Sequence, residues 1–196
     1  MDMLKAGALM LILALTVGAN ATATARYTDP VTVEGVEFAP RPDAADMDLQ
    51  LVGYGVATAR IFFDVYAAAL YLPPAADADS ALAEETPRRL EIQYLLDLEA
   101  DDLARAANTI LQRQHDKATL EGVREGIEQL HALYRDVGPG DRYAMTYRPG
   151  DGTTLTLNGE PQGTIPGGDF ARIYFGIWLG KEPLSEALRE KLLGRA

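Results

Sequence analysis

Alternation of apolar and polar residues marks several segments of the chain as β-strands. Successive side chains of a strand point to opposite faces, so a period of two indicates that one face is buried. Asn158-Gly159 is a strong hairpin signal and predicts a further strand that leads to Thr164. Gly35 interrupts the earliest alternating segment, which is therefore either one strand or a short hairpin. The alternating segments are 31–38, 49–52, 90–96, 143–147 and 153–157.

Residues 61–72 differ from these segments because they are apolar nearly throughout. A run of this length fits a buried helix, but the β-branched and aromatic residues at both ends favour a long strand that is covered on both faces. The small side chains of Ala67, Ala68 and Ala69 predict that another element approaches closely over the middle of this strand.

Apolar residues at three- and four-residue spacing predict helices elsewhere in the chain. Asp101 or Asp102 is the expected N-cap of the first helix, and Gly180 is the expected end of a later one. A short surface helix is predicted within the Asp- and Ala-rich segment 75–85. Strands, a helical insertion, a hairpin and further helices together indicate an α+β fold in which helices cover an antiparallel sheet. The main helical segments are 103–111, 120–134, 170–178 and 184–193.

The N-terminal segment is typical of a secretory signal peptide. Lys5 gives a weakly positive start, and the apolar run Ala6–Val17 is shorter than the ~20 residues that a membrane-spanning helix needs. Overlapping A-x-A cleavage sites follow between Ala19 and Ala25. We therefore expect a signal peptide over 1–25 and a single domain over 26–196, periplasmic or secreted, with no integral membrane segment after cleavage. The alternative is an uncleaved anchor.

Charge and composition narrow the classes of partner and cofactor. The chain has 18 Lys and Arg against 29 Asp and Glu, a net charge of −11, which disfavours nucleic acids and anionic membranes. The absence of cysteine excludes disulfides, thiol catalysis and thiolate metal sites. His115 and His131 lack further ligands at metal-site spacing and are interpreted as solvated helix residues. Gly53-x-Gly55 lacks the third glycine of a dinucleotide site, so we expect no metal and no cofactor.

Several motifs follow one another in an order that is typical of one family. The first half contains Gly53-x-Gly55, the run Phe62–Leu72 and Leu90-x-Ile92-x-Tyr94. The second half contains Gly140-Asp141, Leu155-x-Leu157-Asn158-Gly159, Gly163-Thr164-Ile165-Pro166-Gly167-x-Asp169-Phe170-Ala171 and Ile177-Trp178-Leu179-Gly180. With these motifs, residues 45–194 resemble the bacterial exported branch of the chalcone isomerase-like family. The resemblance implies an open-faced β-sandwich: a large antiparallel sheet, a helical layer over one face and a ligand cleft between them.

The resemblance also implies how an active chalcone isomerase would use this cleft. In the plant enzymes an arginine after Gly-x-Gly positions an anion, and a threonine on the long strand, with a tyrosine and an asparagine on the first helix, polarises a ketone. Here Tyr66 takes the threonine position, and Arg60 lies only near the arginine position. Leu103 replaces the helix tyrosine, and Asn108 is the only asparagine in that region. Loss of the polarising donor disfavours flavanone formation.

The favoured hypothesis is a non-catalytic binder of a small apolar or amphipathic ligand, such as a fatty-acid-like carboxylate. Its ligand-binding candidates are Arg60 at the mouth of the cleft, Tyr66 deeper inside, Tyr94 and Asn108, and no residue is assigned a catalytic role. The alternative is an isomerase, or intramolecular lyase, that acts on an enone-like substrate. A structural or partner-binding exported protein with a filled core stays open, as does a packing role for Tyr94 and a surface ion pair for Arg60.

Overall fold

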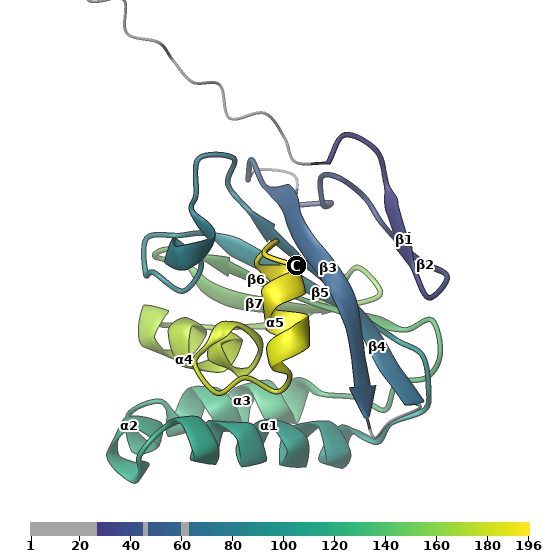
Figure 1. Cartoon of the computed structure of the whole chain (residues 1–196). Helices are drawn as coiled ribbons and strands as arrows, with labels where there is room; N and C mark the ends of the chain where they lie inside the picture. The colour runs from purple at the N-terminus through teal and green to yellow at the C-terminus, as the bar shows by residue number, and fades with distance from the viewer. Residues whose placement is uncertain (1–26, 45–46, 60–62) are drawn as a thin grey trace, which may run out of the picture.

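A six-stranded antiparallel sheet, in the order β3-β4-β5-β6-β7-β8, forms the centre of the molecule (Figure 1). The computed structural model describes residues 27–44, 47–59 and 63–196. A separate hairpin consists of β1 and β2. The elements are β1 (Val31–Val33), β2 (Val36–Phe38), β3 (Gln50–Ala59), β4 (Phe63–Leu72), the 3₁₀ turn η2 (Ala78–Ser80), β5 (Arg88–Tyr94), α1 (Ala100–Gln114), α2 (Lys117–Gly122), α3 (Arg124–Leu133), β6 (Arg142–Arg148), β7 (Gly152–Leu157), β8 (Glu160–Ile165), α4 (Gly168–Leu179) and α5 (Glu186–Leu192).

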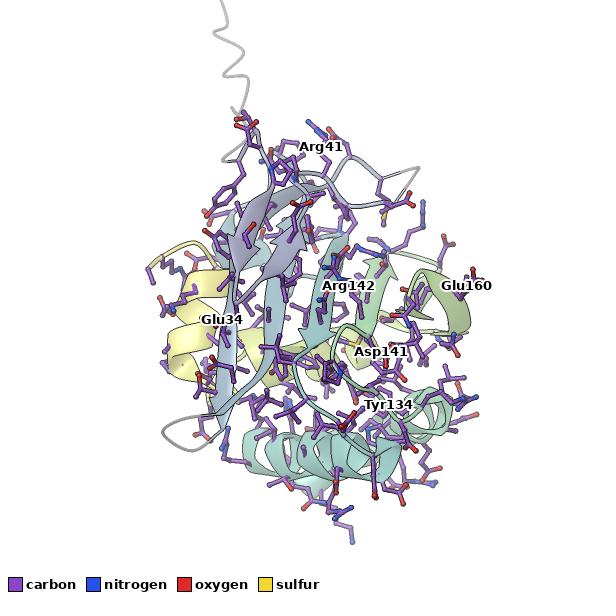
Figure 2. All side chains as sticks on the ribbon, turned by 90° about the vertical axis from the view of Figure 1, so that its right-hand side faces the viewer. Glu34, Arg41, Tyr134, Asp141, Arg142 and Glu160 are labelled. Carbon is purple, nitrogen blue, oxygen red and sulfur yellow. The ribbon has the colours of Figure 1, made fainter. Side chains whose placement is uncertain are left out.

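The two faces of the sheet are covered differently. The layer formed by α1, α3, α4 and α5 packs on one face, whereas the β1–β2 hairpin lies on the other (Figure 1). Figure 2 looks onto the hairpin side, where Arg142 of β6 donates a hydrogen bond from Nη2 to the Glu37 carbonyl at 2.8 Å. The predicted α+β fold, an open-faced sandwich with a helical layer over one face of a large antiparallel sheet, is confirmed.

The long apolar strand, β4, is buried on both faces, as its composition predicts. Ala67 and Ala69 belong to the core on the hairpin side, together with Phe38 of β2. Ala68 and Leu70 belong to the core on the helix side. All four β4 side chains are fully buried, because elements cover this strand from both directions.

The glycines of β3 allow α5 to approach the sheet closely. A Cβ atom on Gly53 would lie 2.0 Å from the carbonyl oxygen of Lys191, and one on Gly55 would lie 3.0 Å from the Leu188 side chain. The Gly53-x-Gly55 pattern therefore serves helix–strand packing in this fold.

The start of α1 differs from the prediction. Glu99 is its N-cap residue, and Asp101 and Asp102 lie in the first turn instead of capping the helix. The cap position makes no side-chain hydrogen bond, but the Asp136 carboxylate accepts from the Ala100 amide at 2.9 Å. A contact from a residue distant in sequence thus satisfies the helix end, and local pattern gives no sign of it.

Three other predicted elements differ from the structure in extent or type. The helix predicted over 120–134 is divided into α2 and α3 at Val123, whose φ of −122° and ψ of 11° are not helical. Gly122, which has low helix propensity, precedes this break. Segment 75–85 contains only the 3₁₀ turn η2, and β5 begins and ends two residues earlier than the alternation over 90–96 suggests.

Helix α4 is buried around most of its circumference, although its sequence pattern predicts a single apolar face. It packs against β7 and against α1, α3 and α5, so few of its side chains reach solvent. Trp178 remains half-buried near its C-terminal end. Within the described part of the chain, no helix is both long and apolar enough to cross a membrane.

Candidate functional site

A cavity of about 450 Å³ lies between the sheet and the helical layer. This volume falls within the ~300–1,000 Å³ typical of small-molecule sites. The side chains at its opening are Thr58, Asp102, Ala106 and Leu184, all of which are exposed to solvent. Its walls are mainly apolar and include Val65, Leu90, Ile92, Leu98, Leu103, Ala107, Ile110, Met145, Leu155 and Ile177.

Tyr66 lies in the cavity wall and is held by Trp178. The indole Nε1 of Trp178 donates a hydrogen bond to the Tyr66 hydroxyl oxygen at 2.9 Å. Because indole can only donate, the Tyr66 hydroxyl must accept here, and its own proton remains available for another acceptor. Burial raises the pKa of Tyr66 above its ordinary value, so the hydroxyl stays protonated near neutral pH.

Tyr94 lies directly across from Tyr66 on the neighbouring strand. The two residues are register partners of β4 and β5, and their ring centroids are 6.0 Å apart. The Tyr94 hydroxyl makes no hydrogen bond with any residue that the structure describes. Burial is the main cause that raises the pKa of Tyr94. The nearby phenols of Tyr134, Tyr66 and Tyr143 raise it further. The cavity therefore has two adjacent phenol groups, each with a proton to donate.

Two further tyrosines of the cavity wall are already engaged with protein groups. The Tyr143 hydroxyl accepts from the Arg135 amide at 2.7 Å. The hydroxyls of Tyr134 and Tyr174 are 2.7 Å apart, and His131 Nε2 lies 3.0 Å from the Tyr174 oxygen. The interpretation of His131 as a solvated helix residue was wrong, since this histidine is half-buried and stacks on Tyr134 with centroids 5.6 Å apart.

The described lining of the cavity carries little charge. Asp102, at the mouth, is its only Asp or Glu, and this part of the lining contains no Lys, Arg or His. Arg60, the cation that the sequence places near the mouth, lies outside the described residues. Ala59 of β3 pairs with Phe63 of β4, and Thr58 lies at the opening.

Asn108 does not reach the cavity. It is an exposed residue of α1 that lines a separate groove of about 510 Å³, which is also bordered by α2 and α3. His115 and His131 line the same groove. Of the four predicted ligand-binding residues, the structure thus brings Tyr66 and Tyr94 together in one cavity and places Asn108 elsewhere.

Sequence reasoning missed Tyr134 and Trp178 as residues of this site. Both occur at helical spacing within apolar stripes, and such spacing indicates core packing equally well. Only the assembled fold shows that Tyr134 lines the cavity and that Trp178 contacts Tyr66 across 112 residues of sequence.

Comparisons with known proteins agree with this architecture. A sequence profile described as chalcone isomerase-like matches residues 30–194. The crystal structure of a fatty-acid binding protein from Arabidopsis thaliana is similar, with a TM-score of 0.67 and 15% sequence identity. The similarity covers 85% of this chain and 96% of the plant protein, and at this identity it shows a common fold. A search of curated protein sequences found no match.

Proposed function

Since the chain belongs to the chalcone isomerase-like family, we propose that it binds a small amphipathic molecule with a fatty-acid-like carboxylate head in the cavity between sheet and helices. The cavity itself carries this proposal: about 450 Å³ of space, open at one mouth, with mainly apolar walls and two phenol donors. An apolar cavity of ~150 Å³ already holds a benzene molecule, so the space here suits a longer hydrocarbon. The fatty-acid binding protein of the same fold supports this ligand class.

Tyr66 and Tyr94 are the proposed head-group residues. A carboxylate only accepts hydrogen bonds, and each of these hydroxyls has a proton without a partner among the described residues. Arg60 follows Ala59 directly in the chain, and we assign to it the positive charge that attracts an anionic head to the mouth. Asp102 at the mouth opposes that attraction, so the proposal requires the charge of Arg60 to outweigh that of Asp102.

Calorimetry with dodecanoate tests the proposal. Tyr94→Phe should weaken binding about tenfold or more, because a hydrogen bond to a charged group contributes roughly 1.5–3 kcal/mol. Tyr94 is a cleaner choice than Tyr66, whose hydroxyl also satisfies Trp178. Asn108→Ala is the matched control and should bind as the unmodified protein does, because this side chain is exposed and lies outside the cavity.

A second variant tests the location of the ligand independently of its head group. Ala107 is a buried residue of α1 in the cavity wall, and Ala107→Phe should fill the space and abolish binding of both dodecanoate and dodecanol. If dodecanoate binds a folded Ala107→Phe variant with unchanged affinity, the cavity is not its site and the proposal is wrong.

An isomerase or intramolecular lyase acting on an enone-like substrate is the second candidate. The observation that favours it is the same pair of donors, since two adjacent hydroxyls that stay protonated can polarise a ketone oxygen. We nevertheless expect naringenin chalcone to cyclise no faster with the protein than in buffer. Clear acceleration that Tyr66→Phe abolishes would favour the enzyme over the binding protein.

We also propose that the chain is exported and that residues 1–25 are removed as a signal peptide. The apolar run and the A-x-A sites support this assignment, and the segment lies outside the described residues. N-terminal sequencing of exported protein should find a start between Thr22 and Arg26. Recovery of intact Met1 from a soluble fraction would contradict it.

A further inference from the structure

A chain of hydrogen-bonding groups connects the surface groove to the cavity. His131 lines the groove, Tyr134 lines the cavity, and Tyr174 lies fully buried between them. His131 Nε2 is 3.0 Å from the Tyr174 oxygen, and the Tyr174 and Tyr134 oxygens are 2.7 Å apart. Both separations are those of real hydrogen bonds, so the three side chains form one continuous path through the helical layer.

Such a path has only two consistent arrangements of its protons. If Nε2 of His131 accepts, Tyr174 donates to it and Tyr134 donates to Tyr174. The Tyr134 hydroxyl then offers only its lone pairs to a ligand in the cavity. If Nε2 carries a proton, it donates to Tyr174, Tyr174 donates to Tyr134, and Tyr134 turns its proton towards the cavity. A protonated imidazole has no lone pair and permits only the second arrangement.

We infer that His131, acting through Tyr174, determines whether Tyr134 offers an acceptor or a donor to the head group of the cavity ligand. This inference rests on the proposed function, and it makes His131 and Tyr174 positioning residues. Neutral His131 allows the acceptor arrangement, which suits an alcohol. Protonated His131 adds a third phenol donor to those of Tyr66 and Tyr94, an arrangement that suits a carboxylate.

The surroundings of His131 favour its neutral form. Burial lowers the pKa of His131 below its ordinary value, so the uncharged imidazole predominates at neutral pH. Tyr134 and Tyr174 pack against its ring. The other charged or titratable groups that line its groove, from α1 to α3, are His115, Lys117, Glu121, Arg124 and Glu128.

Binding of a carboxylate should therefore raise the pKa of His131. A carboxylate can only accept from Tyr134, so its binding excludes the neutral tautomer of His131 in which Nε2 accepts. The neutral Nε2–H tautomer and the protonated imidazole both remain, and the loss of one neutral state favours protonation. The coupling is reciprocal, so a rise of about one unit would mean about tenfold tighter binding at a pH below both His131 pKa values than above them. Dodecanol both donates and accepts, so it should leave the pKa nearly unchanged.

NMR titration of the imidazole resonances can measure this coupling, because the whole chain has only two histidines and His115→Gln identifies the other one. The pKa of His131 would be compared without ligand, with dodecanoate and with dodecanol. We expect the pKa of His131 to rise with dodecanoate and not with dodecanol. Tyr174→Phe interrupts the path and should abolish this rise while dodecanoate still binds.

Calorimetry with His131→Gln provides a second measurement if Tyr174→Phe does not fold. This substitution keeps a polar side chain that does not titrate, so dodecanoate affinity should lose the pH dependence seen in the unmodified protein. His115→Gln, in the same groove, should keep it. A pKa rise that persists in Tyr174→Phe would come from ligand charge alone and would overturn the inference. If dodecanoate binds without a change in the pKa of His131, the inference is wrong and the proposed function still holds. If dodecanoate does not bind, the inference and the proposed function are both wrong.

Discussion

Among the residues that the structure describes, Arg88 is the largest side chain that is completely buried. Its guanidinium carbon lies 4.3 Å from the ring centroid of Tyr147 and 4.9 Å from that of Phe175. Nη1 donates to the carbonyls of Ala83 and Thr86, whereas Nε and Nη2 have no hydrogen-bond partner among the described residues. Burial lowers the pKa of Arg88 to about 10, because removal from water disfavours the charged guanidinium.

Replacement of Arg88 by methionine should therefore leave stability unchanged or raise it. Each unsatisfied buried donor costs about 1–3 kcal/mol, and methionine keeps the apolar contacts with both rings. We expect Arg88→Met to increase the free energy of unfolding in urea by up to about 2 kcal/mol.

The adjacent arginine supplies the control for this prediction. Arg89 forms an ion pair with Glu91 at 2.8 Å, and the Glu91 side chain is only 7% exposed. Arg89→Met should destabilise the protein because it removes one of the cations that neutralise this carboxylate. A loss of stability in Arg88→Met as large as that in Arg89→Met would show that the cation–π contacts outweigh the unsatisfied donors.

At the scale of elements, the contact between α5 and β3 depends on the absence of a side chain at Gly53. The backbone carbonyls of Lys191 and Leu192 occupy the space that a Cβ atom would need. Helix α5 also supplies Leu188 and Leu192 to the core on the helix side of the sheet. The packing of α5 therefore shields the core from solvent next to β3, an edge strand of the sheet.

Gly53→Ala should displace α5 and lower the free energy of unfolding by about 1–3 kcal/mol, the usual cost of overpacking. Urea unfolding followed by far-UV circular dichroism measures the loss. Gly122→Ala is the matched control: Gly122 is an exposed helical residue with nothing within 4 Å of an added Cβ, so this change should be neutral or slightly stabilising. Equal effects at the two positions would contradict the packing role of Gly53.

At the scale of the whole molecule, the buried and half-buried tyrosines make the fold sensitive to alkaline pH. Burial is the main cause that raises the pKa of each of them above the ordinary value of 10.0. Arg88 acts in the opposite sense, but it is a single group. The tyrosines concerned are Tyr66, Tyr71, Tyr94, Tyr134, Tyr143, Tyr147 and Tyr174.

The sign of the effect follows from where the protons bind. Above pH 10 the unfolded chain loses phenol protons that the folded chain keeps, so the stability present below pH 10 is lost as the pH rises further. Each fully buried tyrosine contributes a slope of up to about 1.4 kcal/mol per pH unit. We expect unfolding above about pH 10 in which tyrosinate absorbance and loss of circular dichroism coincide. Gradual ionisation of these tyrosines in a protein that stays folded would contradict this.

Local pattern was sufficient for most of the architecture. The alternation in the strands, the Asn158-Gly159 turn and the two-sided apolar character of β4 each depend on residues close together in sequence, and all three are present in the fold. The sequence likewise indicated that tyrosines near the long strand are candidate ligand-binding residues, and two of them, Tyr66 and Tyr94, line the cavity. These features could be predicted because strand periodicity and turn geometry are properties of a few consecutive residues.

The tertiary structure alone decided which polar groups meet. Trp178 directs the proton of Tyr66 from 112 residues away, Asp136 satisfies the start of α1, and Asn108 faces outward although its helix carries the cavity wall. His131 reads in sequence as a solvated residue, but the packing of α3 against α4 connects it to Tyr174. Hydrogen bonds act over about 3 Å, so their partners depend on how whole elements pack, and no spacing within a single helix or strand encodes that choice.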